Sequence, residues 1–399
     1  MERRTIVIML IILTAGVFLR LWGLSSSAVD TAIQNNNISL ASFSSGFDFF
    51  KLFQTADMAP LYHWYLQLWS AIFNDSTYIY RLASFIPNIA AVIVLYFAGV
   101  EFASNKKNEK NKESVGLTAF GLSAISAYLI LCTQETVLYS LVFFFAALTT
   151  LASLRFFREQ SNKNGAFLAV SSVLLLLTHF AGIVYVFFNI IALIVFISSK
   201  ARKKDAMPFV WSFIGILILL LPVVPFVIRM SARADVISQW WGPFSWHRIY
   251  FYFTDIFSPV IERGISRTDI MGIIVENTVM NFGFIIFALI PAIICLGCVF
   301  RNLIKPQKIQ MYVFAATLCS YLVILIAAIA GKVQFLTGHL IELYPLFILL
   351  AAQGFAKLKS KPLKIVLGTT YVVITLFFII AARLAPVEIA YSLSSISGI

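Results

Sequence analysis

The fold of this chain is decided by a polar and aromatic insert between two apolar runs, whose centre reads SSSAVDTAIQNNN (residues 25–37) and QTADMAPLYHWYLQLW (residues 54–69). A loop of that length is not needed to join two helices. The insert holds two carboxylates, Asp30 and Asp57, with aromatic side chains on both sides. We therefore expect the function of the chain to depend on this segment.

Composition around the insert indicates a membrane protein. The 399 residues are 60% hydrophobic and only 12% charged, with a mean hydropathy of +0.90. Repeated apolar runs of about 18 or more residues indicate membrane spans, and the first run has no small-residue cleavage site, so we interpret it as a retained helix. The sequence predicts a single all-α integral membrane domain over residues 1–399, with about eleven transmembrane helices and no separate soluble domain. The expected helices cover residues 5–24, 82–103, 115–133, 137–157, 166–178, 182–199, 208–229, 277–299, 309–330, 339–356 and 363–383.

The distribution of charge predicts the orientation of these spans. The net charge is +12, but most of the 30 Lys and Arg lie at the N-terminus and in short loops such as KKNEKNK and KLKSKPLK. This is the positive-inside pattern of a membrane protein and not a nucleic-acid surface. It predicts a cytoplasmic N-terminus, with the long loops 25–81 and 230–276 and the C-terminal tail outside.

The four cysteines do not indicate a metal or redox site. Cys132, Cys295, Cys298 and Cys319 all fall in apolar spans, and no second pair or histidine cluster accompanies the CxxC spacing of residues 295–298. We interpret them as packing residues, and we expect no metal and no cofactor.

Both long external loops carry aromatic residues. The second one reads QWWGPFSWHRIYFYFTDIF and contains Trp241 and Arg248. Its rings suit the headgroup level of the membrane, and they could equally stack on sugars. In the first loop Pro60 predicts the start of a helix, and the run PLYHWYLQLWSAIF, with Tyr62 and His63, is expected to lie in the membrane interface.

The two carboxylates of the first loop are candidates for chemistry. Asp30 follows the first helix by a few residues, so it stays near the bilayer surface, where a carboxylate can take a proton from an acceptor hydroxyl or amine. Asp57 precedes the proline that starts the interfacial helix. An isolated Asp in such a loop can also be a solvated residue or a helix N-cap, and this alternative stays open.

The order of these motifs is similar to that of a known family. It runs from an apolar helix through Asp30, a polar stretch, Asp57-x-x-Pro-Leu-Tyr and an aromatic helix to Arg81-Leu-Ala-Ser, and it resembles the GT-C fold glycosyltransferases of the protein O-mannosyltransferase and lipid A aminoarabinose transferase group. The similarity continues at Gln134-Glu-Thr-Val-Leu-Tyr-Ser, at Leu177-Thr-His-Phe and at Leu340-Ile through Pro345.

The resemblance implies a sugar transferase that acts on the extracytoplasmic face. A sugar would pass from a polyprenyl-phosphate carrier to a lipid, glycan or protein acceptor, with Asp30 as the catalytic base, no metal, and basic residues on the donor phosphate. The implied substrate-binding residues are Asp57, Tyr62, His63, Arg81, Glu135, Tyr139, His179, Trp241, Arg248 and His339. Membrane lipids and a possible partner subunit complete the expected partners.

Several motif positions differ from the family pattern. Thr31 stands where a Glu is usual after the Asp, Met58-Ala59 replaces His-Pro, Val137 replaces an Arg, and Gly338-His339 replaces a late Arg-Tyr pair. These differences motivate an alternative, a non-catalytic scaffold or lipid-binding subunit of the same fold. A transporter of lipid-linked saccharides is the third reading, although no pair of broken spans in matching positions supports it.

Eight basic residues could hold the donor phosphate. The candidates are Arg81, Arg229, Arg233, Arg248, Arg263, Arg267, Lys332 and His339. Arg81 could instead snorkel at its helix end, and His179 could make a structural hydrogen bond. Glu342 lies inside a span, where a carboxylate is costly, so a partner such as Lys332 is expected. We expect one external cavity to collect Asp30, Arg81, His179 and an Arg of the second loop.

Overall fold

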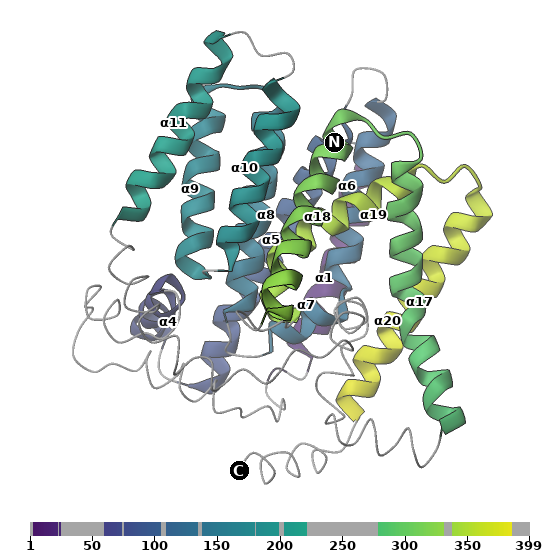
Figure 1. The fold of residues 1–399 in the computed structure, drawn as a ribbon. Helices are drawn as coiled ribbons and strands as arrows, with labels where there is room; N and C mark the ends of the chain where they lie inside the picture. Colours follow the sequence, from purple (N-terminus) through teal and green to yellow (C-terminus); the bar gives the residue numbers. More distant parts are fainter. Residues whose placement is uncertain are drawn as a thin grey trace.

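A computed structural model gives the fold. It describes residues 3–22, 24, 60–73, 76–104, 109–134, 138–179, 181–198, 203–221, 278–330 and 337–384, and within these residues it contains helices and no strand (Figure 1). The helices are α1 (Arg3–Leu21), α4 (Pro60–Phe73), α5 (Thr77–Ala103), α6 (Glu109–Ala124), α7 (Ala127–Cys132), α8 (Tyr139–Arg158), α9 (Asn162–Thr178), α10 (Gly182–Ser198), α11 (Lys203–Leu220), α17 (Thr278–Leu303), α18 (Lys308–Ile329), the 3-10 helix η2 (Thr337–Leu343), α19 (Tyr344–Ala356) and α20 (Lys361–Leu384).

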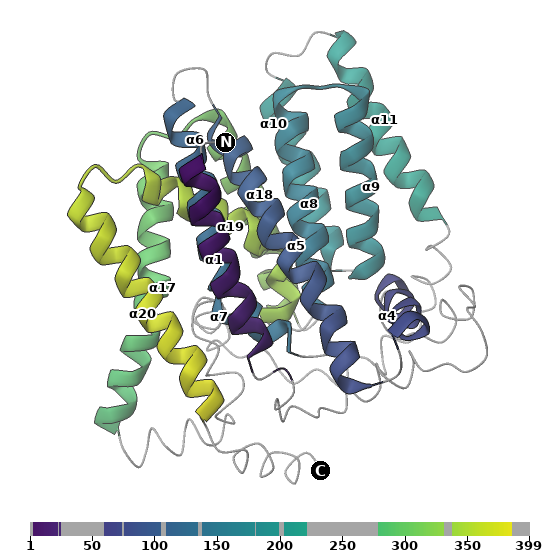
Figure 2. The same ribbon diagram turned by 180° about the vertical axis from the view of Figure 1, so that it is seen from behind.

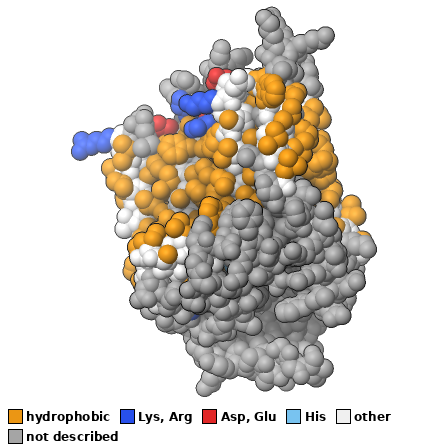
Figure 3. Space-filling model, turned by 90° about the vertical axis from the view of Figure 1, so that its left-hand side faces the viewer, with side chains coloured by type: hydrophobic (Ala, Val, Ile, Leu, Met, Phe, Trp, Pro, Cys, Tyr) orange, Lys and Arg blue, Asp and Glu red, His pale blue; other side chains and the backbone are white. Residues whose placement is uncertain are grey.

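The helices form an integral membrane bundle. Among the residues that the structure describes, four segments are long and apolar enough to cross a membrane, namely Arg3–Leu21, Tyr78–Ala103, Tyr139–Arg158 and Lys308–Ile329, and shorter apolar helices accompany them. Large apolar side chains such as Ile11 and Phe18 are mostly exposed on the helix surfaces, which suits lipid and not water. Figure 3 shows a hydrophobic band below a cap where Lys, Arg and acidic side chains gather. The predicted all-α membrane class is therefore confirmed.

Two close helix contacts depend on glycine. α5 packs against α6 and α8, and α19 packs against α17 and α6. At the α5–α6 crossing, a Cβ on Gly99 would lie 2.9 Å from the Cα of Gly116. At the α17–α19 crossing, a Cβ on Gly354 would overlap the backbone carbonyl of Cys298. Small residues let membrane helices approach in this way, and Cys298 is a buried free thiol that packs there.

Several described Lys and Arg residues lie at one end of the bundle, among them Arg3, Arg4, Lys305, Lys357 and Lys359. The start of α1 and the turns at 159–161, 304–307 and 357–360 lie together at the upper end of Figure 1, and we call this the basic end. α4, the first turn of α5 and the last turn of α9 lie at the opposite end, as the reverse view also shows (Figure 2).

The predicted helix over residues 60–73 is confirmed, because α4 has these bounds.

The helix predicted over residues 115–133 is wrong. The chain between residues 115 and 133 is not a single helix: α6 ends at Ala124 and α7 begins after Ser126, whose side chain accepts a hydrogen bond from the N–H of Leu129. The Arg20 guanidinium donates to the carbonyl oxygens of Ser123 (3.2 Å) and Ala124 (2.5 Å), so the freed end of α6 is capped inside the bundle.

Candidate functional site

A histidine and a carboxylate meet at the end opposite the basic end. His179 is the C-cap of α9, and its N–H donates to the carbonyl of Leu175. Glu342 lies in η2, which leads into the buried helix α19. The His179 Nδ1 and the Glu342 Oε1 form a short contact, with side-chain exposures of 15% and 2%. The buried carboxylate thus has His179 as a partner, whereas the partner expected for it, Lys332, lies outside the described residues.

Arg81 lies in the first turns of α5 and is only 6% exposed. Its Nη1 donates to the backbone carbonyl of Leu24 at 2.9 Å. Leu24 follows α1 and stands just before the loop that carries Asp30. Arg81 therefore fixes the backbone at the entry to this loop.

Gln134 fixes the same segment from another direction. Its Nε2 donates to the carbonyls of Arg20 and Trp22, both at 3.3 Å. The sequence reasoning did not assign Gln134 a role, although it is the first residue of the Gln-Glu motif quoted above. Arg81 and Gln134 together hold the chain at residues 20–24.

The helix α4 rests on α5 and α9 at this end. Tyr65 donates its hydroxyl to the carbonyl of Ala83 (2.7 Å), and Trp69 donates its indole N–H to that of Ile79 (2.8 Å). Tyr62 and His63 of the same helix are buried, with ring centroids 5.7 Å apart. The aromatic run of the first loop is therefore packed against the bundle.

The other predicted site residues divide into two groups. Tyr139 is partly buried at the first residue of α8. The residues Asp30, Asp57, Glu135, Trp241 and Arg248 lie outside the described residues, as does the side chain of His339. The predicted shared cavity, which needs Asp30 and an Arg of the second loop, stays a prediction. Over the part of the chain that the structure describes, no three His, Cys, Asp or Glu side chains gather as a metal ion requires.

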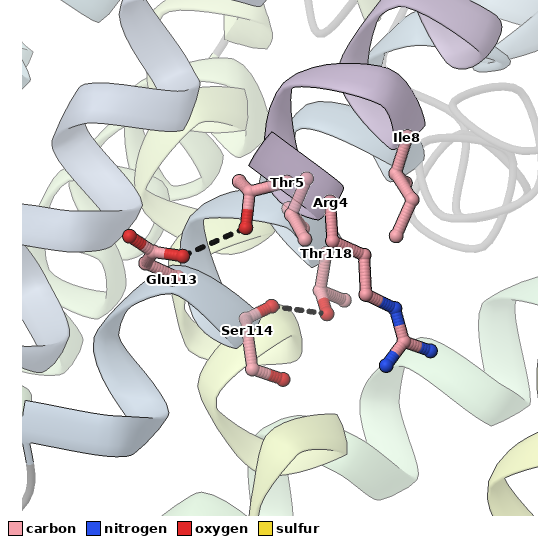
Figure 4. Close-up of a pocket in the computed structure, with 7 residues that line it drawn as sticks. Arg4, Thr5, Ile8, Glu113, Ser114 and Thr118 are labelled. Atoms are coloured by element: carbon pink, nitrogen blue, oxygen red, sulfur yellow. Dashed lines mark hydrogen bonds between the residues drawn. The ribbon is translucent and has the colours of Figure 1, made fainter. Parts of the chain in front are cut away.

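A cavity of about 510 Å³ lies elsewhere, at the basic end between α1 and α6 (Figure 4). Its polar lining includes Arg4, Glu113 and Thr118, and Thr5 donates its hydroxyl to the Glu113 carboxylate at 2.7 Å. It contains none of the predicted site residues. The cavity therefore does not belong to the candidate site.

Comparison with known proteins supports the fold. No protein-family model matches the chain, and no curated protein matches it in sequence. Its structure is similar to the crystal structure of the Archaeoglobus fulgidus oligosaccharyltransferase, with a TM-score of 0.57 and 11% identity. The match covers 94% of this chain and 52% of that one, so this chain spans about half the length of the oligosaccharyltransferase. The chain has a GT-C-like fold, and the narrower O-mannosyltransferase or aminoarabinose transferase group stays a prediction.

Proposed function

We propose that this chain, as one domain over residues 1–399, transfers a sugar from a polyprenyl-phosphate donor to a lipid, glycan or protein acceptor on the extracytoplasmic face. The observation that carries the proposal is the GT-C fold over 94% of the chain. The polar side chains His179, Glu342 and Arg81 at the end away from the basic loops agree with it. The positive-inside pattern supports placing this end outside the cytoplasm.

The chemistry needs one proton acceptor and a stabilised leaving group. In the proposed reaction, the acceptor hydroxyl attacks the anomeric carbon and its proton passes to the Asp30 carboxylate. The bond from that carbon to the phosphate oxygen breaks, and the polyprenyl phosphate leaves with the electron pair. Cationic side chains near the phosphate would stabilise the developing charge.

The described residues suggest how Asp30 would be held. Arg81 and Gln134 bind backbone carbonyls of residues 20–24, six or more residues before Asp30. Holding the reacting groups in place lowers the entropy cost of the reaction, so these two residues are proposed as positioning residues. Arg81, predicted from the sequence as a phosphate ligand, would then act on the loop through Leu24.

A non-catalytic protein of the same fold is the second candidate. The differences at Thr31, Met58, Ala59 and Val137 favour it, because they remove a carboxylate and an arginine that the family pattern contains. Such a protein would bind a lipid-linked sugar without transferring it.

The test is a transfer assay with the purified full chain in lipid vesicles. A panel of polyprenyl-phosphate sugars carrying a labelled sugar is offered together with lipid, glycan and peptide acceptors. Release of polyprenyl phosphate and transfer of label are measured together. We expect both products to appear in equal amounts with at least one donor.

The two candidates give different results in this assay. Saturable donor binding without transfer, for every donor in the panel, would favour the scaffold. Equal transfer by a Glu159→Gln variant is the control, because Glu159 is an exposed carboxylate at the basic end. Absence of both binding and transfer would overturn the proposal.

A further inference from the structure

A group of cations and buried amides at the basic end has no role in the proposed transfer. The ends of α17 and α19 bring Arg301 and Lys357 to this end, beside the turns at 304–307 and 357–360 (Figure 1). Between residues 278 and 384 the sole carboxylate is Glu342, which pairs with His179 at the opposite end. Neither Arg301 nor Lys357 forms an ion pair with a carboxylate in the part of the chain that the structure describes.

Neutral acceptors hold Lys357 in a defined position. Its Nζ donates to the backbone carbonyl of Asn302 (2.9 Å) and to the Oε1 of Gln310 (3.2 Å). The same Oε1 accepts from the N–H of Gln307 at 2.9 Å. An ammonium has three donors, so this arrangement leaves Lys357 with capacity for one more acceptor.

Buried amide atoms nearby also lack a partner. Gln310 is 0% exposed, and its Nε2 has no hydrogen-bond partner. This Nε2 belongs to the amide whose oxygen accepts from Lys357, so the unused donor adjoins the ammonium. Asn302 is likewise 0% exposed, with both side-chain amide atoms unpartnered. A buried polar group without a partner is costly, and at Gln310 the missing partner is an acceptor.

We propose that the group formed by Arg301, Lys357 and Gln310 binds the phosphate of an anionic phospholipid headgroup. A phosphate supplies both negative charge and acceptor oxygens. Lys357 directly follows the apolar helix α19, so the group lies at the depth where headgroups lie. Basic pockets between transmembrane helices on the cytoplasmic side bind such headgroups. The inference does not depend on the proposed transfer.

The charge balance at Lys357 supports this occupant. Burial and the nearby positive charge of Arg301 lower the pKa of Lys357. Both causes disfavour the protonated ammonium. A bound anion would offset them.

The test is a titration of the detergent-purified full chain with short-chain phosphatidylglycerol. Phosphatidylcholine of the same chain length and inorganic phosphate are titrated in parallel, and bound lipid is counted by native mass spectrometry. We expect saturable binding of phosphatidylglycerol alone. We expect Lys357→Gln and Arg301→Gln to weaken it by about tenfold each, and the exposed control Lys359→Gln by less than about twofold.

Three results would overturn the proposal. These are equal affinity for phosphatidylcholine, an equal loss in Lys359→Gln, and inorganic phosphate binding as tightly as the lipid. If Lys357→Gln fails to fold, Arg301→Gln decides, because the Arg301 side chain is exposed and donates no hydrogen bond within the described residues.

Discussion

Two of the charged side chains that the structure describes as buried, Arg20 and Glu342, are held in different ways. Arg20 is 0% exposed and donates four hydrogen bonds to neutral oxygens: the Oδ1 of Asn88 (3.0 Å) and the backbone carbonyls of Gly16 (3.1 Å), Ser123 and Ala124. Glu342 is 2% exposed, and its described partner is the imidazole of His179. The described partners of the Arg20 guanidinium are thus neutral oxygens, whereas the described partner of the Glu342 carboxylate is an imidazole.

This difference separates structure from candidate chemistry. A guanidinium presents five donors in a fixed plane, and the carbonyls that end a helix carry its negative dipole. Arg20 thus closes the end of α6, and Asn88 extends the cluster by donating to the carbonyl of Leu129 (3.2 Å). The hydrogen bonds of Arg20 and Asn88 therefore serve to stabilise the fold. The His179–Glu342 pair stays a candidate for chemistry, because a histidine contacts a buried carboxylate at the end away from the basic end.

The largest loss of stability is expected for Arg20→Met. It leaves the carbonyls of Ser123 and Ala124 and the Oδ1 of Asn88 without their donor, at about 1–3 kcal/mol each. We expect the free energy of unfolding to fall by more than about 3 kcal/mol, with a lower thermal midpoint in detergent. Arg3→Met is the control, because Arg3 is exposed on the same helix. Equal midpoints for the two variants would contradict the structural role.

A smaller loss is expected for Asn88→Ala. The variant removes the acceptor of the Arg20 Nε and the donor to Leu129, but it leaves Arg20 three carbonyl acceptors. We expect a cost of about 2 kcal/mol in thermal unfolding. Asn162→Ala, at an exposed position of α9, should change stability by less than about 0.5 kcal/mol. A larger loss of unfolding free energy in Asn88→Ala than in Arg20→Met would contradict the larger structural role given to Arg20.

A still smaller loss of stability than for Asn88→Ala is expected at the His179–Glu342 pair. Glu342→Gln keeps the shape of the side chain and can still form a hydrogen bond, so we expect a cost of about 1 kcal/mol. Combined with His179→Ala in a double-mutant cycle, it should show a coupling of about 0.5–3 kcal/mol. Strictly additive losses would show that the two side chains do not interact energetically.

The sequence predicted what local patterns determine. Apolar length predicted the membrane helices, and Pro60 with its aromatic run predicted α4. The break after Ala124 could not be predicted, because Arg20 caps it from more than a hundred residues away and no Pro or Gly stands at residues 122–126. The partner of Glu342 was missed for the same reason. His179 is far away in sequence, whereas Lys332 is close.

Arg81 illustrates the limit for the candidate site. The family resemblance implied a phosphate ligand, with snorkelling at the helix end as the alternative, and the structure shows it bound to the backbone carbonyl of Leu24. From the sequence alone, a cation at a helix end can bind either a phosphate or a backbone carbonyl. Which of the two Arg81 binds depends on the position of the chain that follows α1. Local sequence does not determine that position.

The central claim is tested most directly by the rate of sugar transfer in Asp30→Asn. The variant keeps the shape of the side chain and removes the proton acceptor. We expect the transfer rate to fall by about 10²–10⁴-fold at normal membrane levels, with stability changed by less than about 0.5 kcal/mol. Asp57→Asn should be milder. Full transfer activity in Asp30→Asn would contradict the claim that this carboxylate is the base of a GT-C glycosyltransferase.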